Sequence, residues 1–508
     1  MNATLALVRL SRRRFAQASL ASIAAAGRLP AAAPPKLVVW LIAEQFRSDY
    51  LDRYSSLFGR NGFRRMMAEG ACFSDCRVNA STFSASSLAT LATGAYPDVH
   101  GIVADRWFDR AEKRVTEATP ELLRAPALSE EVLAADPANR VLALGLDRPA
   151  ASLVSPGSKT HVYSLEAVPS EVDQPVWLSA VRASHGAARV SGGKWLACRA
   201  SEDSQPLRVL LEDPGRPEEF RALFRSSPFA QSAQFEMLRA MVTEERLGLG
   251  EGITLAPVVL SSTAWLGYEQ GGDSALMRDL VLHLDVEIEK LIEFLEREPG
   301  AGNYALAFTA AHGAPPLPDA AIRPSLAVSS DAVAKVVNDT LSAQYDAPNT
   351  RTRYVERYVY PFLYLRAEPL KRYNARSVRH IAAEAALRVP GVAAYFTADG
   401  DCSRGGVWLD RFRNSFHASR SGDVMLAYEP GAIEAFGARG VSYGSLYNYD
   451  VRVPALFFGR AIRAGSHQNR IESVDIVPTL ARLMNVAPPA ASVGEVLESV
   501  FAVEMPRK

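Results

Sequence analysis

Residues 79–102 combine small and hydroxyl side chains in a way that suits nucleophilic attack on a bound anion. The stretch opens Asn-Ala-Ser-Thr-Phe-Ser-Ala-Ser-Ser and ends in Tyr-Pro-Asp-Val-His-Gly-Ile. It follows a strand-like segment and could open a helix, whose first N–H groups bind anions while a hydroxyl attacks. The alternative is a Ser/Thr-capped loop. Taken alone, the stretch favours the loop, because it has no G-x-S-x-G elbow and no P-loop lysine.

Three apolar segments are predicted to be buried parallel strands that would position such a site. They span residues 36–43, 257–263 and 304–309. Helical patterns alternate with them, and Glu44 directly follows the first strand. Ligands bind at the carboxyl ends of strands in doubly wound sheets, so Glu44 is a candidate site residue; the alternative is an ordinary helix-capping carboxylate.

This alternation predicts an α/β fold with a mostly parallel central sheet, helices on both faces and an inserted cap. Further elements are predicted as a long amphipathic helix at 274–298, a helix at 377–386, a strand at 453–459 and a last helix at 475–484. The core is expected at 36–148, 257–314 and 440–508, the cap at 149–256, and a second, irregular insertion with core elements at 315–439.

The N-terminal residues are typical of an export signal. Ser11-Arg12-Arg13-Arg14-Phe15 precedes an alanine-rich run over residues 16–26 and a Pro/Ala stretch over residues 29–35. Paired arginines followed by Phe and small uncharged residues indicate a twin-arginine signal rather than a basic amphipathic helix. We therefore predict that residues 1–35 are an export segment and that the protein is periplasmic or extracellular. No later stretch reaches the ~20 uninterrupted apolar residues of a membrane span.

Composition excludes several classes of partner. Lys+Arg and Asp+Glu each number 56, so no excess positive charge indicates binding to nucleic acid or an anionic membrane. The four cysteines, Cys72, Cys76, Cys198 and Cys402, are too few for a disulfide framework, and their pairing stays open. The C-x3-C spacing of the first two, with no adjacent histidine, argues against a zinc knuckle.

Several dispersed motifs occur in a recognisable order. They are Thr93-Gly-Ala-Tyr-Pro-x-x-His-Gly-Ile102, Trp107-Phe-Asp-Arg110, Ser421-Gly-Asp-Val424, Tyr449-Asp-x-x-Val-Pro454 and Asp475-Ile-Val-Pro-Thr-Leu480. In these motifs the chain resembles the alkaline phosphatase superfamily. Within it, the chain is similar to the phosphate-irrepressible phosphatases of the type I phosphodiesterase and nucleotide pyrophosphatase branch. The resemblance covers nearly the whole chain after residue 35 and implies an alkaline-phosphatase-like fold.

The resemblance also implies where a phosphoryl-transfer site would lie. In this family two zinc ions at the carboxyl ends of the strands activate a Thr or Ser nucleophile. Ser84 stands at the nucleophile position, and Glu44 replaces the first-strand aspartate. Asp105 replaces a substrate-binding asparagine, and Arg148 is one cation where the family has two. Asp105 and Arg148 are therefore candidate substrate-binding residues, although Arg148 could equally be part of a surface pair with Asp147.

Most of the implied metal ligands are replaced in this sequence. The family's Asp-x-x-Gly-His, Ala-Asp-His-Gly and His-Gly motifs occur here as Ala264-Trp-Leu-Gly-Tyr268, Ala310-Ala-His-Gly313 and Tyr443-Gly444. The replaced positions are thus Ala264, Tyr268, Ala311 and Tyr443, whereas Glu44 and His312 remain as remnant ligands. Since zinc needs about four donors and a two-zinc site roughly twice that number, no metal cofactor is expected unless a reduced site holds zinc.

The substitutions are coherent with a metal-free pocket. Clustered carboxylates without their cations repel one another, and alanines at 264 and 311 remove that cost. Tyr268 and Tyr443 would refill the volume of histidine and metal. Without metal, Ser84 has no neighbouring activator in the sequence, which favours a helix-capping role for Ser84. His312 is then expected to be a hydrogen-bonded structural residue. The alternative is that His312, though distant in the sequence, acts as a general base for Ser84.

Three hypotheses about function follow from the sequence. The leading one is an exported protein of this fold that has lost the two-metal site and acts in binding or interaction. The second is a working phosphomonoesterase or phosphodiesterase with a reduced metal site around Glu44, Ser84 and His312, which would use zinc. The third is binding of a carbohydrate or aryl ligand by the aromatic pocket and the Tyr-rich segment at residues 354–364. The partner is left open, with a small anionic or aromatic ligand as the candidate.

Overall fold

The computed structural model describes residues 33–166, 174–317, 327–434 and 443–502. The predicted export segment, residues 1–35, therefore lies outside the described residues except for its last three. The described part contains no helix long and apolar enough to cross a membrane. All four cysteines are free in the structure.

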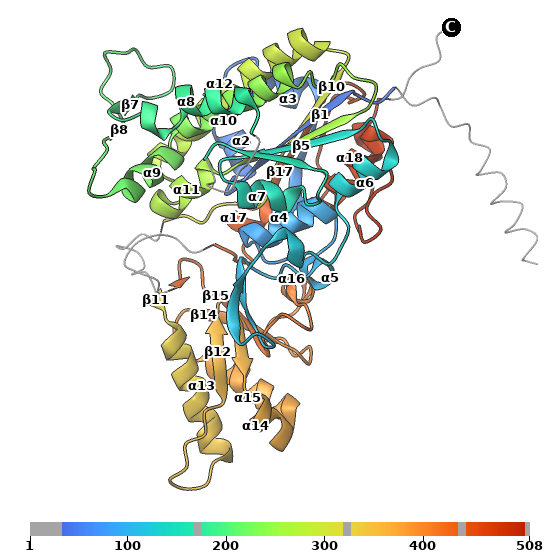
Figure 1. Cartoon of the computed structure of the whole chain (residues 1–508). Coiled ribbons are helices and arrows are strands. Elements are labelled where there is room, and N and C mark those ends of the chain that lie inside the picture. The colour runs from blue at the N-terminus through green and yellow to red at the C-terminus, as the bar shows by residue number, and fades with distance from the viewer. Residues whose placement is uncertain (1–32, 167–173, 318–326, 435–442, 503–508) are drawn as a thin grey trace, which may run out of the picture. The chain divides into compact units, whose positions relative to one another are not determined.

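A nine-stranded sheet forms the centre of the protein (Figure 1). Its strands, in spatial order, are β18 (Gly465–His467), β2 (Ala71–Arg77), β17 (Arg452–Gly459), β10 (Tyr304–Ala310), β1 (Leu37–Ala43), β9 (Thr254–Leu260), β5 (Arg140–Gly145) and β6 (His161–Ser164), with β19 (Ile471–Glu472) also paired to β2. Strand β17 pairs antiparallel with both of its neighbours, and the other pairings in this sheet are parallel. The predicted mostly parallel sheet is confirmed.

The register of the three central strands places their carboxyl ends side by side. Ala43 at the end of β1 lies opposite Leu260 of β9 on one side and Ala310 of β10 on the other. All residues of these three strands are buried, as expected for continuous apolar segments covered on both faces. Glu44 and the segments starting at residues 261 and 311 therefore leave the sheet at the same edge.

Helices cover both faces of this sheet. Figure 1 shows α10 (Pro228–Glu244) and α12 (Ala275–Leu295) on one side and α4 (Ser84–Thr93) and α7 (Arg148–Val154) on the other. The predicted amphipathic helix is α12, which begins after Ser274, whose side chain accepts a hydrogen bond from Met277 N–H. Its buried residues recur at helical spacing, including Leu280, Leu284, Ile288 and Leu291. Further helices around the sheet are α2 (Asp49–Arg53), α3 (Phe63–Glu69), α6 (Leu128–Ala135), α11 (Ser262–Gln270), α17 (Asn448–Val451) and α18 (Ile476–Met484).

Residues 149–256, the predicted cap, divide between the sheet and its surroundings. Strand β6 joins the edge of the main sheet, and α10 packs against α12 and the strands. Between them lie α8 (Val176–His185), the hairpin of β7 (Gly193–Trp195) and β8 (Arg208–Leu210), and α9 (Pro217–Arg225). Part of this segment therefore completes the central α/β layers.

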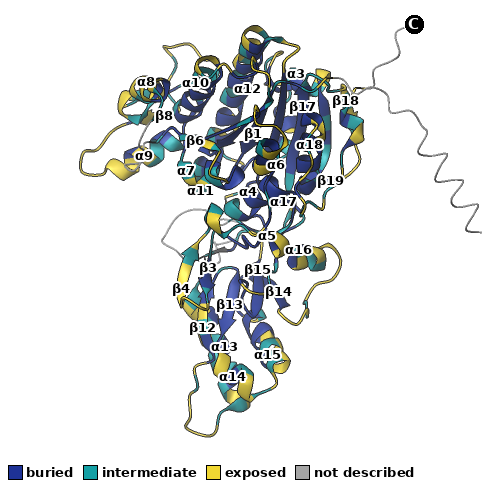
Figure 2. Cartoon of the chain, turned by 45° about the vertical axis from the view of Figure 1, so that its right-hand side comes forward, coloured by how far each residue is buried: buried dark blue, intermediate teal, exposed yellow. Residues whose placement is uncertain are grey.

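Residues 327–434 form a second, regular α/β unit with its own core. Its antiparallel sheet has the order β12 (Val355–Val359), β13 (Phe362–Leu365), β15 (Val424–Tyr428) and β14 (Val392–Thr397). Figure 2 shows α13 (Ser330–Tyr345) and α15 (Ala375–Leu387) packed against these strands. Smaller elements of this unit are α14 (Ala367–Arg372), α16 (Val407–Ser415) and the pair β11 (Ala327–Val328) and β16 (Ile433–Glu434). Outside it, between α4 and β5, lie α5 (Pro97–His100) and the hairpin of β3 (Arg106–Asp109) and β4 (Arg114–Glu117).

Candidate functional site

Ser84 and His312 are in hydrogen-bond contact at the carboxyl edge of the sheet. Ser84 is the first residue of α4, and its Oγ lies 2.9 Å from His312 Nε2. The other ring nitrogen, Nδ1, lies 2.9 Å from the Gly313 carbonyl oxygen. Because a carbonyl only accepts, we assign the ring proton to Nδ1, which leaves Nε2 to accept from the Ser84 hydroxyl.

The environment of this pair keeps the imidazole neutral. His312 is fully buried, and burial lowers its pKa to about 4. The N-cap position of α4 is Phe83, whose backbone is extended, and no side chain caps this helix end. The Ser84 hydroxyl therefore contacts His312 rather than capping the helix.

Tyr443 covers the other side of His312. The two rings are stacked, with centroids 5.3 Å apart and planes 11° apart. The Tyr443 hydroxyl donates to Asp105 Oδ2, while Asp105 Oδ1 accepts from the Ala85 N–H at 2.8 Å. Burial raises the pKa of both Tyr443 and Asp105. Tyr268 completes this aromatic cluster, with its ring centroid 5.0 Å from that of Tyr443.

Glu44 is the buried acid of the site. Its side-chain Oε2 accepts a hydrogen bond from the Ser261 hydroxyl at 2.6 Å, and its backbone carbonyl oxygen accepts one from the Thr263 hydroxyl. Burial raises the pKa of Glu44 to about 7; the Ser261 hydrogen bond opposes the rise, and the negative charge of Asp147 adds to it. The residue therefore titrates close to neutral pH.

A pocket of about 240 Å³ opens beside these residues, and we call it the Ser84 pocket. Polar groups on its wall are Glu44, Ser84, Asp105, Asp147, Ser261 and Tyr268, and the remaining lining residues are Ala85, Leu88, Ala118, Pro149, Ala150, Leu153, Ala264 and Trp265. The described lining thus includes three carboxylates and neither Lys nor Arg. Burial raises the pKa of Asp147, as it does for the other two acids.

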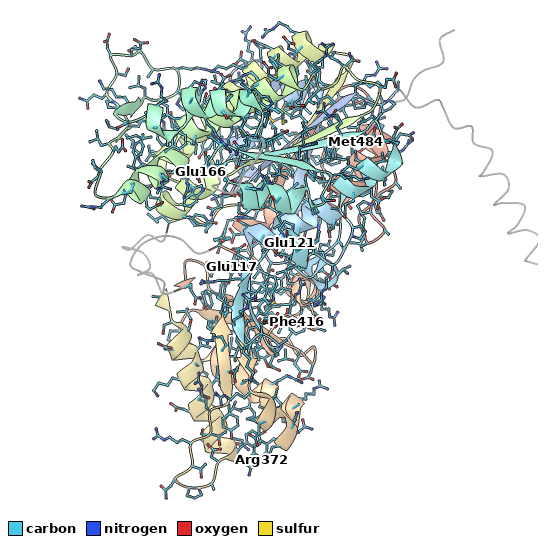
Figure 3. All side chains as sticks on the ribbon, in the orientation of Figure 1. Glu117, Glu121, Glu166, Arg372, Phe416 and Met484 are labelled. Carbon is cyan, nitrogen blue, oxygen red and sulfur yellow. The ribbon has the colours of Figure 1, made fainter. Side chains whose placement is uncertain are left out.

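Two arginines beside this wall are engaged elsewhere. Arg148 donates from its guanidinium to the Val162 carbonyl oxygen at 2.8 Å and does not line the pocket. The guanidinium of Arg225 lies 4.6 Å from the centre of the Trp265 ring and donates to Glu166 Oε2 at 2.6 Å. Glu166 is labelled in Figure 3. Of the two predicted substrate-binding residues, the structure thus brings Asp105 to the pocket wall and turns Arg148 toward a strand backbone.

The donor set at this edge does not fit two zinc ions. Ala264 and Ala311 present methyl groups, and the Tyr443 hydroxyl is already hydrogen-bonded to Asp105. Of the family's ligand positions, Glu44, Ser84 and His312 keep a donor side chain, against roughly eight donors for two zinc ions. Among the residues that the structure describes, no group of three or more His, Cys, Asp or Glu side chains is arranged to hold a metal ion.

Two residues at or beside the site, Ser261 and Asp450, were not predicted as site residues from the sequence. Ser261 holds the Glu44 carboxylate, but a single serine after a strand carries no motif. Asp450 was quoted only as part of the Tyr-Asp-x-x-Val-Pro motif; it is fully buried, its carbonyl oxygen accepts from the Gly313 N–H at 2.6 Å, and burial raises its pKa to about 7. A carboxylate two residues before an apolar strand was the available signal for Asp450.

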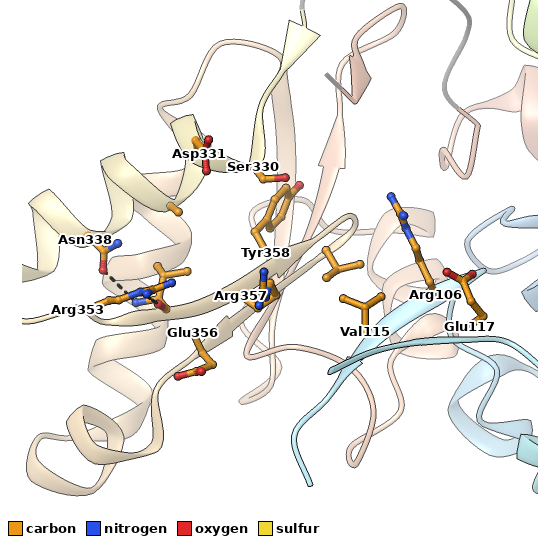
Figure 4. Close-up of a pocket in the computed structure, with 13 residues that line it drawn as sticks. Arg106, Val115, Glu117, Ser330, Asp331, Asn338, Arg353, Glu356, Arg357 and Tyr358 are labelled. Carbon is orange, nitrogen blue, oxygen red and sulfur yellow. Dashed lines mark hydrogen bonds between the residues drawn. The ribbon is translucent and has the colours of Figure 1, made fainter. Parts of the chain in front are cut away.

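A second pocket, of about 470 Å³, lies between the β3–β4 hairpin and the second unit (Figure 4). Its charged lining residues are Arg106, Arg353, Arg357, Glu117, Asp331 and Glu356. Asn338 on α13 accepts a hydrogen bond from the Val355 N–H at 3.0 Å, which ties the helix to β12 (Figure 4). The three arginines are matched by three acids, so this wall favours neither anions nor cations by formal charge.

Known proteins resemble the chain over nearly its whole length. The type I phosphodiesterase / nucleotide pyrophosphatase family model matches residues 38–441. Alkaline phosphatase PafA of Elizabethkingia meningoseptica is 23% identical over 525 residues, covering 92% of this chain and 94% of that protein. Alkaline phosphatase PhoK of Sphingomonas sp. is 25% identical over 506 residues, covering 90% of each.

Solved structures agree on the fold. The crystal structure of PafA matches with a TM-score of 0.80 at 22% identity, covering 92% of this chain and 99% of that chain. Murine ectonucleotide pyrophosphatase / phosphodiesterase 5 matches with a TM-score of 0.54 at 15% identity, covering 89% and 95%. The expected alkaline-phosphatase-like fold is confirmed. Since the family model spans most of the sequence, the chain belongs to the type I phosphodiesterase / nucleotide pyrophosphatase family of the alkaline phosphatase superfamily.

Proposed function

We propose that the chain is an exported member of this family that does not carry out two-zinc phosphoryl transfer and instead binds a small uncharged or cationic ligand in the Ser84 pocket. The observation that carries the proposal is the position of Tyr443, whose ring stacks on His312 while its hydroxyl binds Asp105. The Tyr443 side chain thereby fills the space beside His312, and its hydroxyl occupies one carboxylate oxygen of Asp105. PafA and PhoK are named as alkaline phosphatases, so this chain would represent a change of role within a hydrolase family.

The charge of the pocket wall supports the choice of ligand. Two like charges about 4 Å apart repel by about 4 kcal/mol at an effective dielectric constant of about 20. A phosphate close to any of Glu44, Asp105 and Asp147 that is ionised would meet this repulsion without a Lys or Arg among the described lining residues to offset it. An uncharged or cationic molecule avoids the cost, and Trp265 and Tyr268 provide aromatic surface for it.

Export is supported by the sequence of the N-terminal segment. Two arginines followed by Phe15 and an uncharged alanine-rich run are typical of twin-arginine signals. Fusion of residues 1–35 to a reporter that is active only outside the cytoplasm tests this: we expect export with Arg12 and Arg13 intact and loss of export when both are replaced by Lys. Unchanged export of the double-Lys fusion would contradict a twin-arginine signal.

A hydrolase with a reduced zinc site is the second candidate. The contact between Ser84 and His312, with Glu44 on the same pocket wall, favours it, because a potential nucleophile and two zinc-type donors are brought together. Such an enzyme would hydrolyse phosphate mono- or diesters with zinc held by Glu44 and His312.

Calorimetric titration with zinc and phosphatase assays separate these candidates. We expect wild-type protein to show no tight zinc binding and no phosphate-ester hydrolysis above a Ser84→Ala control. A matched variant restores the family's donors through Glu44→Asp, Ala264→Asp, Tyr268→His, Ala311→Asp and Tyr443→His, and should gain zinc binding. Wild-type hydrolysis above the Ser84→Ala control, with zinc bound, would overturn the proposed function in favour of the second candidate.

A further inference from the structure

Ser84 and His312 hold the relative positions of a nucleophile and its base. Ser84 lines the pocket, whereas His312 is fully buried and is absent from the described pocket lining. Their 2.9 Å separation is within the roughly 2.6–3.2 Å over which a general base takes a proton. A ligand in the pocket would therefore meet the hydroxyl first, with the lone pair of Nε2 behind it.

The surroundings of His312 fix the ring in the orientation that a base requires. The Gly313 carbonyl accepts from Nδ1–H and so selects the tautomer with a free Nε2. Tyr443 stacked on the ring face restricts its rotation. Gly313 itself is held in place, because its N–H donates to the Asp450 carbonyl oxygen at 2.6 Å.

The start of α4 provides a partial positive charge beside the nucleophile. Ser84 is the first residue of this ten-residue helix, so negative charge that develops on an attacked group lies near the helix N-terminus. One N–H at this end, that of Ala85, is already bound to Asp105. Stabilisation of the oxyanion would thus come from the helix end as a whole rather than from the Ala85 N–H.

The pocket wall indicates the substrate class. Its carboxylates, when ionised, disfavour a substrate that is already anionic, such as a phosphate monoester, whereas a carboxylic ester binds uncharged and carries negative charge only in the transition state. Leu88, Leu153 and Trp265 supply apolar surface for an acyl group, and the volume of about 240 Å³ suits a short one.

We propose that Ser84 and His312 form a metal-independent nucleophile–base pair that hydrolyses small uncharged carboxylic esters through an acylated Ser84. Ser84 Oγ attacks the ester carbonyl carbon and its proton passes to His312 Nε2. The bond to the ester oxygen breaks, and the leaving alkoxide takes that proton and departs as the alcohol. Water then attacks the acyl group and gives a proton to His312, and Ser84 Oγ leaves with that proton as the carboxylic acid is released. The inference rests on the proposed function, because a His312 whose Nε2 held a metal could not accept the proton.

The test is covalent labelling of EDTA-treated full-length protein with an uncharged alkyl fluorophosphonate, read by peptide mass spectrometry. Attack by Ser84 displaces fluoride, which leaves with the hydroxyl proton, and adds the phosphonyl group to Oγ. Ser184, at an exposed position of α8 with its Oγ 2.8 Å from His185 Nδ1, is the matched control in the same molecule. The Ser184 hydroxyl donates its proton to the Ala180 carbonyl oxygen at 2.8 Å and so lacks the assistance of a base. We therefore expect Ser84 to react at least about 100-fold faster than Ser184, the usual lower range of general-base assistance.

Variants then assign the role of each residue. Ser84→Ala should abolish the adduct together with p-nitrophenyl acetate hydrolysis, and His312→Gln should slow labelling of Ser84 by about 100-fold or more. His312→Asn is the second variant if His312→Gln fails to fold, and the comparison of Ser84 with Ser184 in wild-type protein needs no variant at all.

Each outcome decides between the proposals. Fast labelling of Ser84 that depends on His312 and persists after EDTA supports the inference. Labelling of Ser84 no faster than that of Ser184, or unaffected in the His312 variants, overturns the inference and leaves the proposed function standing. Zinc in the untreated protein, with Ser84 reactivity lost after EDTA, overturns both.

Discussion

Tyr443 stacks on His312 with ring centroids 5.3 Å apart and planes 11° apart, and its hydroxyl donates to Asp105. The contact joins the loop before α17 to the end of β10 and to the segment before β3. Gly444 makes it sterically possible, since its φ is +91° and a Cβ there would lie 2.5 Å from the Phe83 ring.

Tyr443→Phe should therefore destabilise the protein without disturbing the stacking. The variant leaves the buried Asp105 carboxylate without its phenol donor, which we expect to lower the free energy of unfolding by about 1–3 kcal/mol. Tyr443→Ala, which also removes the ring, should cost about 3–5 kcal/mol. Urea unfolding of both variants measures the difference, and equal stabilities of Tyr443→Phe and wild-type would show that the hydrogen bond contributes nothing.

Glu44→Gln should stabilise the protein at neutral pH. The pKa of Glu44 rises from 4.5 to about 7 on folding, so the folded state holds its proton more tightly than the unfolded state. This tighter binding of the proton stabilises the folded state by about 3 kcal/mol in total. The stabilisation is full below pH 4.5 and is lost as the pH rises through about 7. Glutamine does not titrate, so its advantage over Glu44 should grow between pH 4.5 and 7. Unfolding free energies at several pH values check this, and a pH-independent difference would contradict it.

His100 should make the fold sensitive to acid. Its Nδ1 accepts from the Ile102 N–H and its Nε2 contacts Thr90 Oγ1, and burial lowers its pKa from 6.5 to about 3. The unfolded state therefore binds the proton first, and stability that is full above pH 6.5 is lost as the pH falls toward 3. The loss amounts to about 4 kcal/mol by about pH 3.5.

The matched variant for this prediction is His100→Gln, which keeps a polar side chain and cannot take up the proton. It should be less stable than wild-type at pH 7 and lose less stability on acidification. Parallel acid-induced unfolding curves for the two proteins would exclude His100 as the acid-sensitive group.

Asp423 should be a structural anchor between the β3–β4 hairpin and the second unit. Its side chain is 4% exposed and binds Arg110 Nη2 at 2.8 Å and Arg379 Nε at 2.9 Å. Asp423→Asn removes the charge opposite Arg110 and one of the two charges opposite Arg379, which also lies 3.0 Å from Asp399, and should cost about 2 kcal/mol. The exposed Lys335–Asp339 pair provides the control, since Asp339→Asn should change stability by less than about 0.5 kcal/mol. Similar thermal shifts for both variants would contradict the anchoring role.

Continuous apolar segments made the core of the fold predictable. Strands β1, β9 and β10 were located within a few residues, and α12 followed from its helical periodicity and from Ser274. The antiparallel direction of β17 could not be predicted, because a buried strand has the same composition in either direction. The second sheet was predicted as irregular because its strands are short and pair across long stretches of sequence, as β13 does with β15.

The site was predictable only as a set of positions. Family motifs located Glu44, Ser84 and His312, which the structure brings to one sheet edge. Whether Ser84 would cap α4 or contact His312 depends on how two distant segments approach each other, and the sequence favoured capping. The orientation of Arg148 toward Val162 likewise arises from the fold around β6 and has no signal in the local sequence.

Counting zinc in the purified full-length protein tests most directly whether the site holds two zinc ions. The protein is exposed to excess zinc and desalted, and its zinc content is measured by inductively coupled plasma mass spectrometry. We predict far less than one zinc per chain for wild-type, and a clear gain for the variant in which the five family donors are restored. Two zinc ions per wild-type chain would contradict the account.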